Sequence, residues 1–121
     1  MKTLKGILTV AILFVGTSLF AQNVINANEI DITLDGTVTR EQLNDLATQT
    51  KANGLIFKYA PTFNAQRVMT SLEYKIYNAD ATVELVHVPR IEFTSPSIKT
   101  RFHFTKTAGT FTKVCAGTEC Q

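Results

Sequence analysis

The sequence predicts an α+β domain in which a single helix packs on one face of a mainly antiparallel sheet, in the order β-α-β-β-β-β-β. Only residues 39–54 repeat apolar side chains at helical spacing between a start and a stop signal. From residue 55 onward, apolar and polar residues alternate with a period of two, which is typical of strands with one buried face. The length of 121 residues, with 45% hydrophobic and 18% charged side chains, is that of one ordinary domain.

The N-terminus has the order of a secretory signal peptide. Lys2 and Lys5 precede an apolar run, and small residues follow it. A membrane anchor is the alternative, but the apolar stretch of residues 7–20 is shorter than the roughly 20 residues that cross a bilayer. The two lysines account for the excess of 12 basic over 10 acidic side chains, so the exported chain is expected to be neutral and to contain no membrane span.

We expect residues 1–21 to be removed by cleavage after Ala21. The string TSLFAQ around this site resembles the ends of signal peptides in secreted proteins of Bacteroidetes-type bacteria. The small residues 16–18 offer a competing site. Residues 22–28 lack any period and are expected to form a flexible lead, and residues 29–121 a single domain, located in the periplasm or outside the cell.

The first strand and the helix have the clearest patterns. Residues 29–34 alternate strictly between polar and apolar, which predicts a strand that ends at Asp35-Gly36. Thr39 and Gln42 form a capping-box pattern at the helix start, and Asn53-Gly54 gives the stop. The apolar stripe expected to face the sheet consists of Leu43, Leu46, Ala47 and Thr50.

Strands account for the rest of the chain. Pro61 is expected to end the strand that begins at residue 55, and Pro89 to end the strand over residues 82–88, because proline cannot donate to a sheet ladder. Between them, one face of a strand is expected to carry Val68, Thr70, Leu72, Tyr74 and Ile76. The last two strands are expected at residues 98–107 and 110–115, with a turn at Ala108-Gly109.

Both cysteines, Cys115 and Cys120, lie in the last seven residues. In an exported chain this spacing predicts a disulfide that pins the C-terminus. A zinc site is the alternative, but it would need two further ligands nearby. The loop is short, so the disulfide is expected to contribute only about 2 kcal/mol through loop entropy.

The sequence carries no catalytic motif. Ser71, Ser95 and Ser97 lie outside any Gly-x-Ser-x-Gly elbow, and bonded cysteines cannot act as nucleophiles. The six glycines are scattered and form no phosphate loop. Carboxylate pairs could form from Glu73, Glu84 and Glu92, but any solvated antiparallel sheet offers such pairs. We therefore predict that the protein is not an enzyme.

No cofactor and no metal ion are predicted. A zinc or copper site would need His87 and His103 to lie close together, with a third ligand such as Glu84 or Glu92. Nothing in the sequence requires that proximity. An ordinary surface or half-buried imidazole accounts for each histidine.

A basic row is the most distinctive surface feature. Lys99, Arg101 and His103 alternate along one strand, so the pleat places them on one face, and we expect Lys106 and Lys113 to extend this row. One interpretation is a binding site for an anionic partner, such as lipopolysaccharide, nucleic acid or an acidic protein surface. The alternative is a solvated sheet face or an edge strand protected by charge.

Residues 35–76 show a family-like pattern. A helix that opens with Thr-x-x-x-Leu is followed by a Lys-x-x-Gly-Leu-x-Phe-x-Tyr strand and a Leu-x-Tyr-x-Ile strand. This resembles a βαββ module at the C-terminal ends of antibiotic-sensor-type membrane metallopeptidases of Bacteroidetes, and it is similar to the short N-terminal domain of secretins and TonB-dependent receptors. The chain lacks the His-Glu-x-x-His motif of a metallopeptidase and the second helix of the receptor domain. The resemblance implies a module that binds a component of the cell envelope.

Two functions are consistent with these patterns. The first is a small, exported, non-catalytic binding module of the envelope or secretome, with an envelope protein or an anionic surface as its partner. The alternative is a secreted inhibitor of a hydrolase, which would insert the loop of residues 60–65 into a cleft. Pro61 would stiffen that loop and Phe63 would anchor it.

Overall fold

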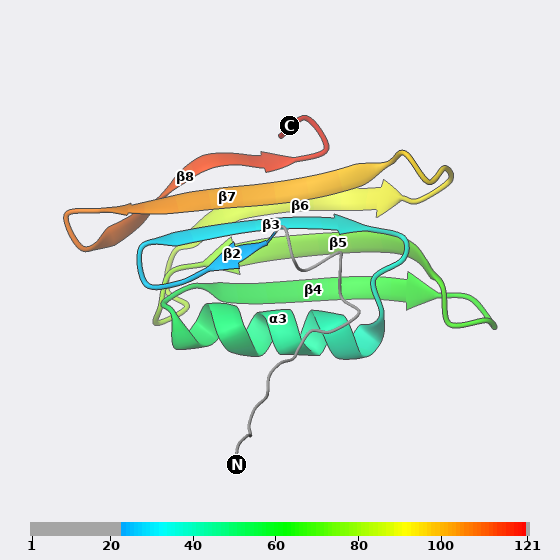
Figure 1. Cartoon of the computed structure of the whole chain (residues 1–121), viewed down its shortest axis with the longest axis horizontal. Coiled ribbons are helices and arrows are strands. Elements are labelled where there is room, and N and C mark those ends of the chain that lie inside the picture. The colour runs from blue at the N-terminus through cyan, green and yellow to red at the C-terminus, as the bar shows by residue number, and fades with distance from the viewer. Residues whose placement is uncertain (1–22, 121) are drawn as a thin grey trace, which may run out of the picture.

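The computed structural model describes residues 23–120, which form one helix and seven strands (Figure 1). The predicted α+β class is confirmed. The predicted signal peptide, residues 1–21, lies outside the described residues. In chain order the elements are β2 (Val24–Ile25), β3 (Glu29–Asp35), α3 (Arg40–Ala52), β4 (Ile56–Phe63), β5 (Met69–Tyr77), β6 (Glu84–Glu92), β7 (Lys99–Thr107) and β8 (Thr110–Gly117).

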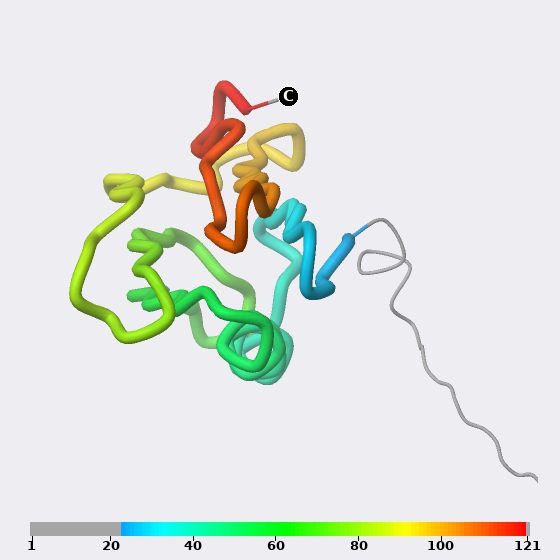
Figure 2. Tube along the Cα trace, turned by 90° about the vertical axis from the view of Figure 1, so that its left-hand side faces the viewer, coloured from blue at the N-terminus to red at the C-terminus, as the bar shows by residue number. Residues whose placement is uncertain are grey.

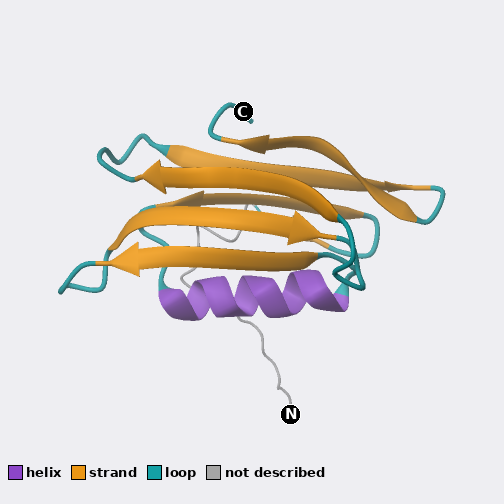
Figure 3. Cartoon of the chain, turned by 180° about the vertical axis from the view of Figure 1, so that it is seen from behind, coloured by secondary structure: helices purple, strands orange, loops and turns teal. Residues whose placement is uncertain are grey.

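The strands form two antiparallel sheets. One has the order β2-β3-β7-β8 and the other the order β4-β5-β6. The two sheets form layers, and α3 runs along the lower side of the molecule beneath β4 (Figures 1 and 3). In the end-on view of Figure 2, the helix lies between β3 and β4, so it covers one open side between the layers.

The core lies between the two sheets and is centred on aromatic rings. Phe57, Tyr74 and Phe102 come from β4, β5 and β7, and their ring centroids are 5.2–5.6 Å apart. Tyr74 also forms a hydrogen bond with Thr100 across the sheets, with 2.6 Å between the hydroxyl oxygens. Aliphatic side chains from β3 complete this core from the facing sheet, where Ile30, Ile32 and Leu34 are fully buried.

The helix forms as its end signals predict. Thr39 is the N-cap: its hydroxyl accepts from the backbone N–H of Gln42, whose side chain accepts from the N–H of Thr39. Asn53 is the C-cap, and Gly54 follows with a φ of 104°, a conformation that favours glycine. The buried face of the helix carries Leu43, Leu46 and Thr50, as predicted, whereas Ala47 is half-buried.

The prediction that two prolines end strands is wrong. Pro61 lies within β4 and Pro89 within β6. Both strands are at the edges of the three-stranded sheet, where proline is tolerated because its nitrogen can face away from the neighbouring strand. Pro89 also lies at an irregularity in the pairing, since Val88 pairs with Tyr74 and Ile91 with Leu72. The expected loop at residues 60–65 is therefore strand as far as Phe63.

Strand β5 follows its predicted face only in part. Leu72, Tyr74 and Ile76 are buried, but Val68 and Thr70 are exposed. The pairing with β4 shifts between Thr62 and Phe63, which reverses the alternation at the start of β5. As a result, Met69 and Ser71 are buried instead.

The segment expected to be a flexible lead contains structure. Within it, β2 pairs with β3. The side-chain oxygen of Asn26 accepts hydrogen bonds from the backbone N–H groups of Asn28 and Glu29, at 2.8 and 2.9 Å. This Asx-type turn connects the two strands, and short polar side chains favour such turns.

The C-terminal strand ends in the predicted disulfide. Cys115 and Cys120 are bonded, with their Cα atoms 5.4 Å apart. The turn before β8 is also as predicted: Ala108 and Gly109 both have positive φ, as a two-residue type I′ hairpin requires. Among residues 23–120 no helix is long and apolar enough to cross a membrane.

Candidate functional site

The basic row of β7 lies beside an acidic row. Lys99, Arg101 and His103 alternate with the buried Thr100, Phe102 and Phe104, so they share the outer face of the sheet, as predicted. Strand β3 pairs with β7 along its whole length, from Glu29 opposite Thr105 to Asp35 opposite Lys99. The outward residues of β3 include three carboxylates, those of Glu29, Asp31 and Asp35.

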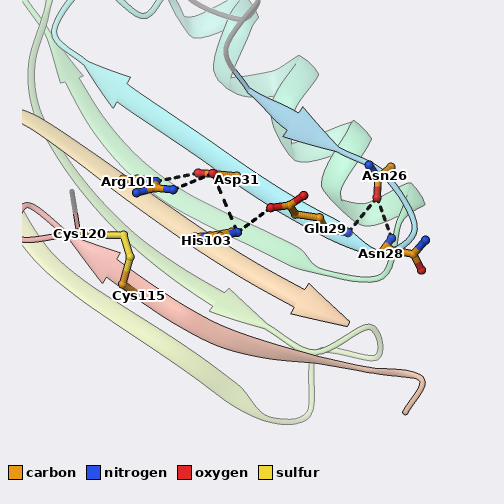
Figure 4. Close-up of polar contacts among 8 residues, drawn as sticks. All are labelled: Asn26, Asn28, Glu29, Asp31, Arg101, His103, Cys115 and Cys120. Carbon is orange, nitrogen blue, oxygen red and sulfur yellow. Dashed lines mark hydrogen bonds and ion pairs between the residues drawn. A yellow bond between two sulfur atoms is a disulfide. The ribbon is translucent and has the colours of Figure 1, made fainter. Parts of the chain in front are cut away.

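Two of the basic side chains bind these carboxylates (Figure 4). Arg101 donates from Nε to Oδ1 of Asp31 and from Nη2 to Oδ2, both at 2.8 Å. His103 Nε2 lies 2.8 Å from Oε2 of Glu29 and 4.0 Å from Oδ2 of Asp31. The bidentate arrangement matches the planar guanidinium to the carboxylate, which is the strongest geometry for such a pair.

The contacts follow the register of the two strands. Arg101 lies opposite Thr33 and His103 opposite Asp31, and each reaches the carboxylate two residues before its direct partner. The direct partner of Lys99 is Asp35, and the residue two positions before Asp35 is Thr33, which is neutral. Lys99 is exposed, and no ion pair to it is found among residues 23–120. Its direct partner, Asp35, instead accepts hydrogen bonds from Thr37.

The ion pair sets the charge state of this face. Hydrogen bonds from Arg101 hold the pKa of Asp31 below its ordinary value of 3.8, although partial burial opposes the shift. The pKa of Arg101 is raised by the same hydrogen bonds. Both groups are therefore charged across the physiological pH range.

The row is thus part of a mixed-charge surface. Sequence reasoning identified the cations but missed the carboxylates beside them, because the pairing of β3 with β7 joins residues about 70 positions apart. The sequence does contain one signal for this pairing: acidic residues alternate along β3 and basic residues along β7. Opposite charges on neighbouring strands stabilise their pairing. Anion binding by Lys99, Arg101 and His103 stays a prediction, and Lys99 is the cation with the most open surroundings.

The other histidine lies on the opposite sheet. His87 of β6 contacts Glu73 at 3.0 Å, and both side chains are 43% exposed. The structure does not bring His87 and His103 together, since they belong to different sheets. The two further ligands that were considered form other ion pairs: Glu84 with Lys75, and Glu92 with Arg90.

A groove of about 480 Å³ is lined by residues at one end of the molecule. It lies where the end of α3, the β5–β6 connection and the β7–β8 hairpin meet. Local sequence patterns do not reveal this groove, because its walls come from three distant segments. Its lining consists of Gly54, Leu55, Asn78, Ala79, Asp80, Val83, Leu85, Lys106, Gly109, Thr110 and Phe111.

The groove combines apolar side chains with one charge of each sign. The ammonium group of Lys106 lies 4.7 Å from the ring centroid of Phe111, within cation–π range. Asp80 accepts hydrogen bonds from the hydroxyl and backbone N–H of Thr82, which hold its pKa below the ordinary value. Val83 adds an apolar side chain that is 51% exposed.

The segment considered as an inhibitory loop is not an extended loop. Residues 60–63 belong to β4, and only the five residues from Asn64 to Val68 connect β4 to β5. Phe63 is half-buried, with the guanidinium of Arg40 lying 4.6 Å from its ring centroid. The ring is therefore engaged with the start of α3.

No protein-family model, curated protein or solved structure matches this chain. The resemblance of residues 35–76 to a βαββ module therefore stays a prediction. The order strand, helix, strand, strand is present as β3-α3-β4-β5, but β3 lies in one sheet and β4 and β5 in the other.

Proposed function

We propose that the chain is an exported, non-catalytic binding module of the cell envelope or secretome, and that the end groove contacts its partner. Export is supported by the N-terminal order of lysines, apolar run and small residues. The Cys115–Cys120 disulfide is typical of proteins that fold in an oxidising compartment.

The groove is the observation that carries the proposal. Its volume of about 480 Å³ falls within the range of roughly 300–1,000 Å³ that is common for ligand sites. Its walls include connecting segments held by two sheets, the kind of placement at which binding residues concentrate. Its lining includes the exposed apolar Val83 together with Asp80 and Lys106, so the groove suits an apolar side chain that is flanked by polar or charged groups.

The groove lining supports binding rather than catalysis. It contains no serine, cysteine or histidine, and Asp80 is its single carboxylate. A carboxylate pair or a nucleophile with its base is therefore missing from these residues. Lys106 contacts the face of an aromatic ring, where its role is to present positive charge.

A pull-down from envelope extract with two matched variants tests the proposal. Val83→Asp places a charge in the groove, whereas Val68→Asp places the same charge in the β4–β5 connection at the opposite end. The two valines are 51% and 49% exposed, so neither substitution disturbs the core. We expect the wild type and Val68→Asp to recover the same partner in stoichiometric amount, and Val83→Asp to lose it.

The outcomes separate the two functions. A partner retained by Val83→Asp but lost by Val68→Asp would contradict the groove as the contact surface. Stoichiometric recovery of one hydrolase, with loss of its activity, would favour the inhibitor instead. Both variants should have the wild-type free energy of unfolding within about 0.5 kcal/mol, as exposed substitutions usually do.

A further inference from the structure

We propose that Glu29, Asp31 and His103 form a binding site for a divalent transition-metal ion, with Zn²⁺ as the reference ion. One ligand atom from each of these residues lies within 4.8 Å of the other two. An imidazole nitrogen with two carboxylate oxygens is a donor set that suits zinc, whereas magnesium and calcium prefer oxygen alone. The site shares no residue with the end groove, so it is independent of the proposed function.

The sheet fixes the three ligands in place. Asp31 and His103 are direct partners in the β3–β7 pairing, and Glu29 lies two residues before Asp31 on the same face. The backbone N–H of Glu29 is also held by the side chain of Asn26 (Figure 4). Ligands on regular, paired strands keep their separation better than ligands on loops.

The ligand atoms are close enough for side-chain movement to bring them onto one ion. Metal–ligand bonds of about 2.05 Å in a tetrahedral site place neighbouring ligand atoms roughly 3.4 Å apart. His103 Nε2 lies 2.8 Å from Glu29 Oε2 and 4.0 Å from Asp31 Oδ2, so one contact is too short and the other too long by similar amounts. To bring all three separations near this value, the imidazole and the carboxylate of Glu29 have to move by roughly an ångström.

Arg101 is compatible with the bound ion as a positioning residue. It holds Asp31 through both carboxylate oxygens. Each of these oxygens has a second lone pair, so Oδ2 can accept the hydrogen bond from Arg101 and coordinate the ion at the same time. Outer hydrogen bonds of this kind orient the carboxylate ligands of metal sites. Two carboxylates against one guanidinium also leave a net negative charge to attract the cation.

One side of the site is open to solvent. The side chains of His103 and Asp31 are 17% and 20% exposed, whereas that of Glu29 is 40% exposed. The open side allows entry of the ion and leaves room for water as the fourth ligand, a common arrangement with three protein ligands.

The test is a titration of the purified protein with ZnCl₂, monitored through the ring nitrogens of its two histidines by NMR and by calorimetry. His87 is the internal control, because it contacts a single carboxylate. We expect one equivalent of Zn²⁺ to shift the Nε2 resonance of His103 and to leave that of His87 unchanged. Shifts of both rings in parallel, or of neither, would overturn the proposal.

Two matched variants give an independent measurement. His103→Gln should weaken Zn²⁺ binding by at least about tenfold, the lower bound for loss of even an outer partner of a metal ligand. His87→Gln should bind as the wild type does. Glu29→Gln serves as a second ligand variant at a more exposed position, with circular dichroism to confirm that each variant is folded. Unchanged affinity in both ligand variants contradicts the site, as does equal affinity of the wild type for Mg²⁺.

Discussion

The hydroxyl groups of Tyr74 and Thr100 form a hydrogen bond of 2.6 Å between the two sheets. Each residue is only 1% exposed, so water cannot replace either partner. The polar tip of a core tyrosine therefore ties β5 to β7, while its ring packs against Phe57 and Phe102. This hydrogen bond is a directional contact between the two sheets inside a largely apolar core.

The costs of removing the two partners of this hydrogen bond should not be additive. Tyr74→Phe leaves the Thr100 hydroxyl buried without its partner, which should lower the free energy of unfolding by about 1–3 kcal/mol. The double change Tyr74→Phe with Thr100→Val should cost less than the sum of the two single changes. Urea unfolding of the four proteins measures the coupling. Additive costs would show that the hydroxyls do not act as a pair.

Stability should fall in alkali because of the same tyrosine. Burial raises the pKa of Tyr74 to about 12, above the value of 10.0 expected in the unfolded chain. The folded state then retains its proton where the unfolded state loses it, so the contribution to stability is complete below about pH 10 and is lost as the pH rises toward 12. Urea unfolding in this range should show a steeper decline for the wild type than for Tyr74→Phe. Parallel curves would contradict the assignment.

The stripe of the helix is expected to contribute strongly to stability. Leu46 is 3% exposed and belongs to the main core. Leu46→Ala should lower the free energy of unfolding by about 2–5 kcal/mol, the usual cost of truncating a buried leucine. Gln49→Ala, on the exposed side of α3, should change it by less than about 0.5 kcal/mol. A cost below about 1 kcal/mol for Leu46→Ala would mean that the helix is not packed as described.

Arg101 and Lys99, the two permanently charged residues of the basic row, should contribute differently to the free energy of unfolding. Arg101→Gln removes a bidentate ion pair and should cost about 1 kcal/mol, whereas Lys99→Gln should be close to neutral. The pKa of Asp31 lies below 3.8 because of Arg101, so this contribution is present above about pH 4 and is lost as the pH falls through the folded pKa. Urea unfolding at pH 7 and pH 3 should show the cost of Arg101→Gln shrinking in acid. Equal costs at both pH values would argue against the ion pair.

Heparin chromatography tests the anionic partner of the same row. Three carboxylates on β3 face Lys99 and Arg101, so we expect weak retention at low salt that depends on Lys99 more than on Arg101. Lys99→Gln should then elute earlier than Arg101→Gln. Strong retention that Arg101→Gln abolishes would instead support the whole row as an anion site.

Local signals in the sequence predicted the local structure well. The capping box of Thr39 and Gln42, the Ala108-Gly109 turn and the disulfide depend on residues close together in the chain, and each is present. The prediction that prolines end two strands was wrong because a proline is tolerated within a strand that lies at the edge of a sheet. Edge position is a property of the sheet order, and alternation along one strand does not reveal it.

The candidate sites depend on long-range pairing. The neighbours of Arg101 and His103 come from β3, and the groove joins segments from residue 54 to residue 111. Hydrophobic alternation shows that both β3 and β7 expose charged faces, but it does not say that the faces adjoin. For this reason the sequence identified the cations and not the cluster that they form with Glu29 and Asp31.

The most direct test of the groove as the contact surface is photo-crosslinking in the native host. A photoreactive amino acid replaces Val83 in one protein and Val68 in another, at positions of nearly equal exposure and opposite ends of the molecule. The account predicts one defined adduct from position 83 after irradiation and none from position 68. A defined adduct from position 68 with none from position 83 would contradict it.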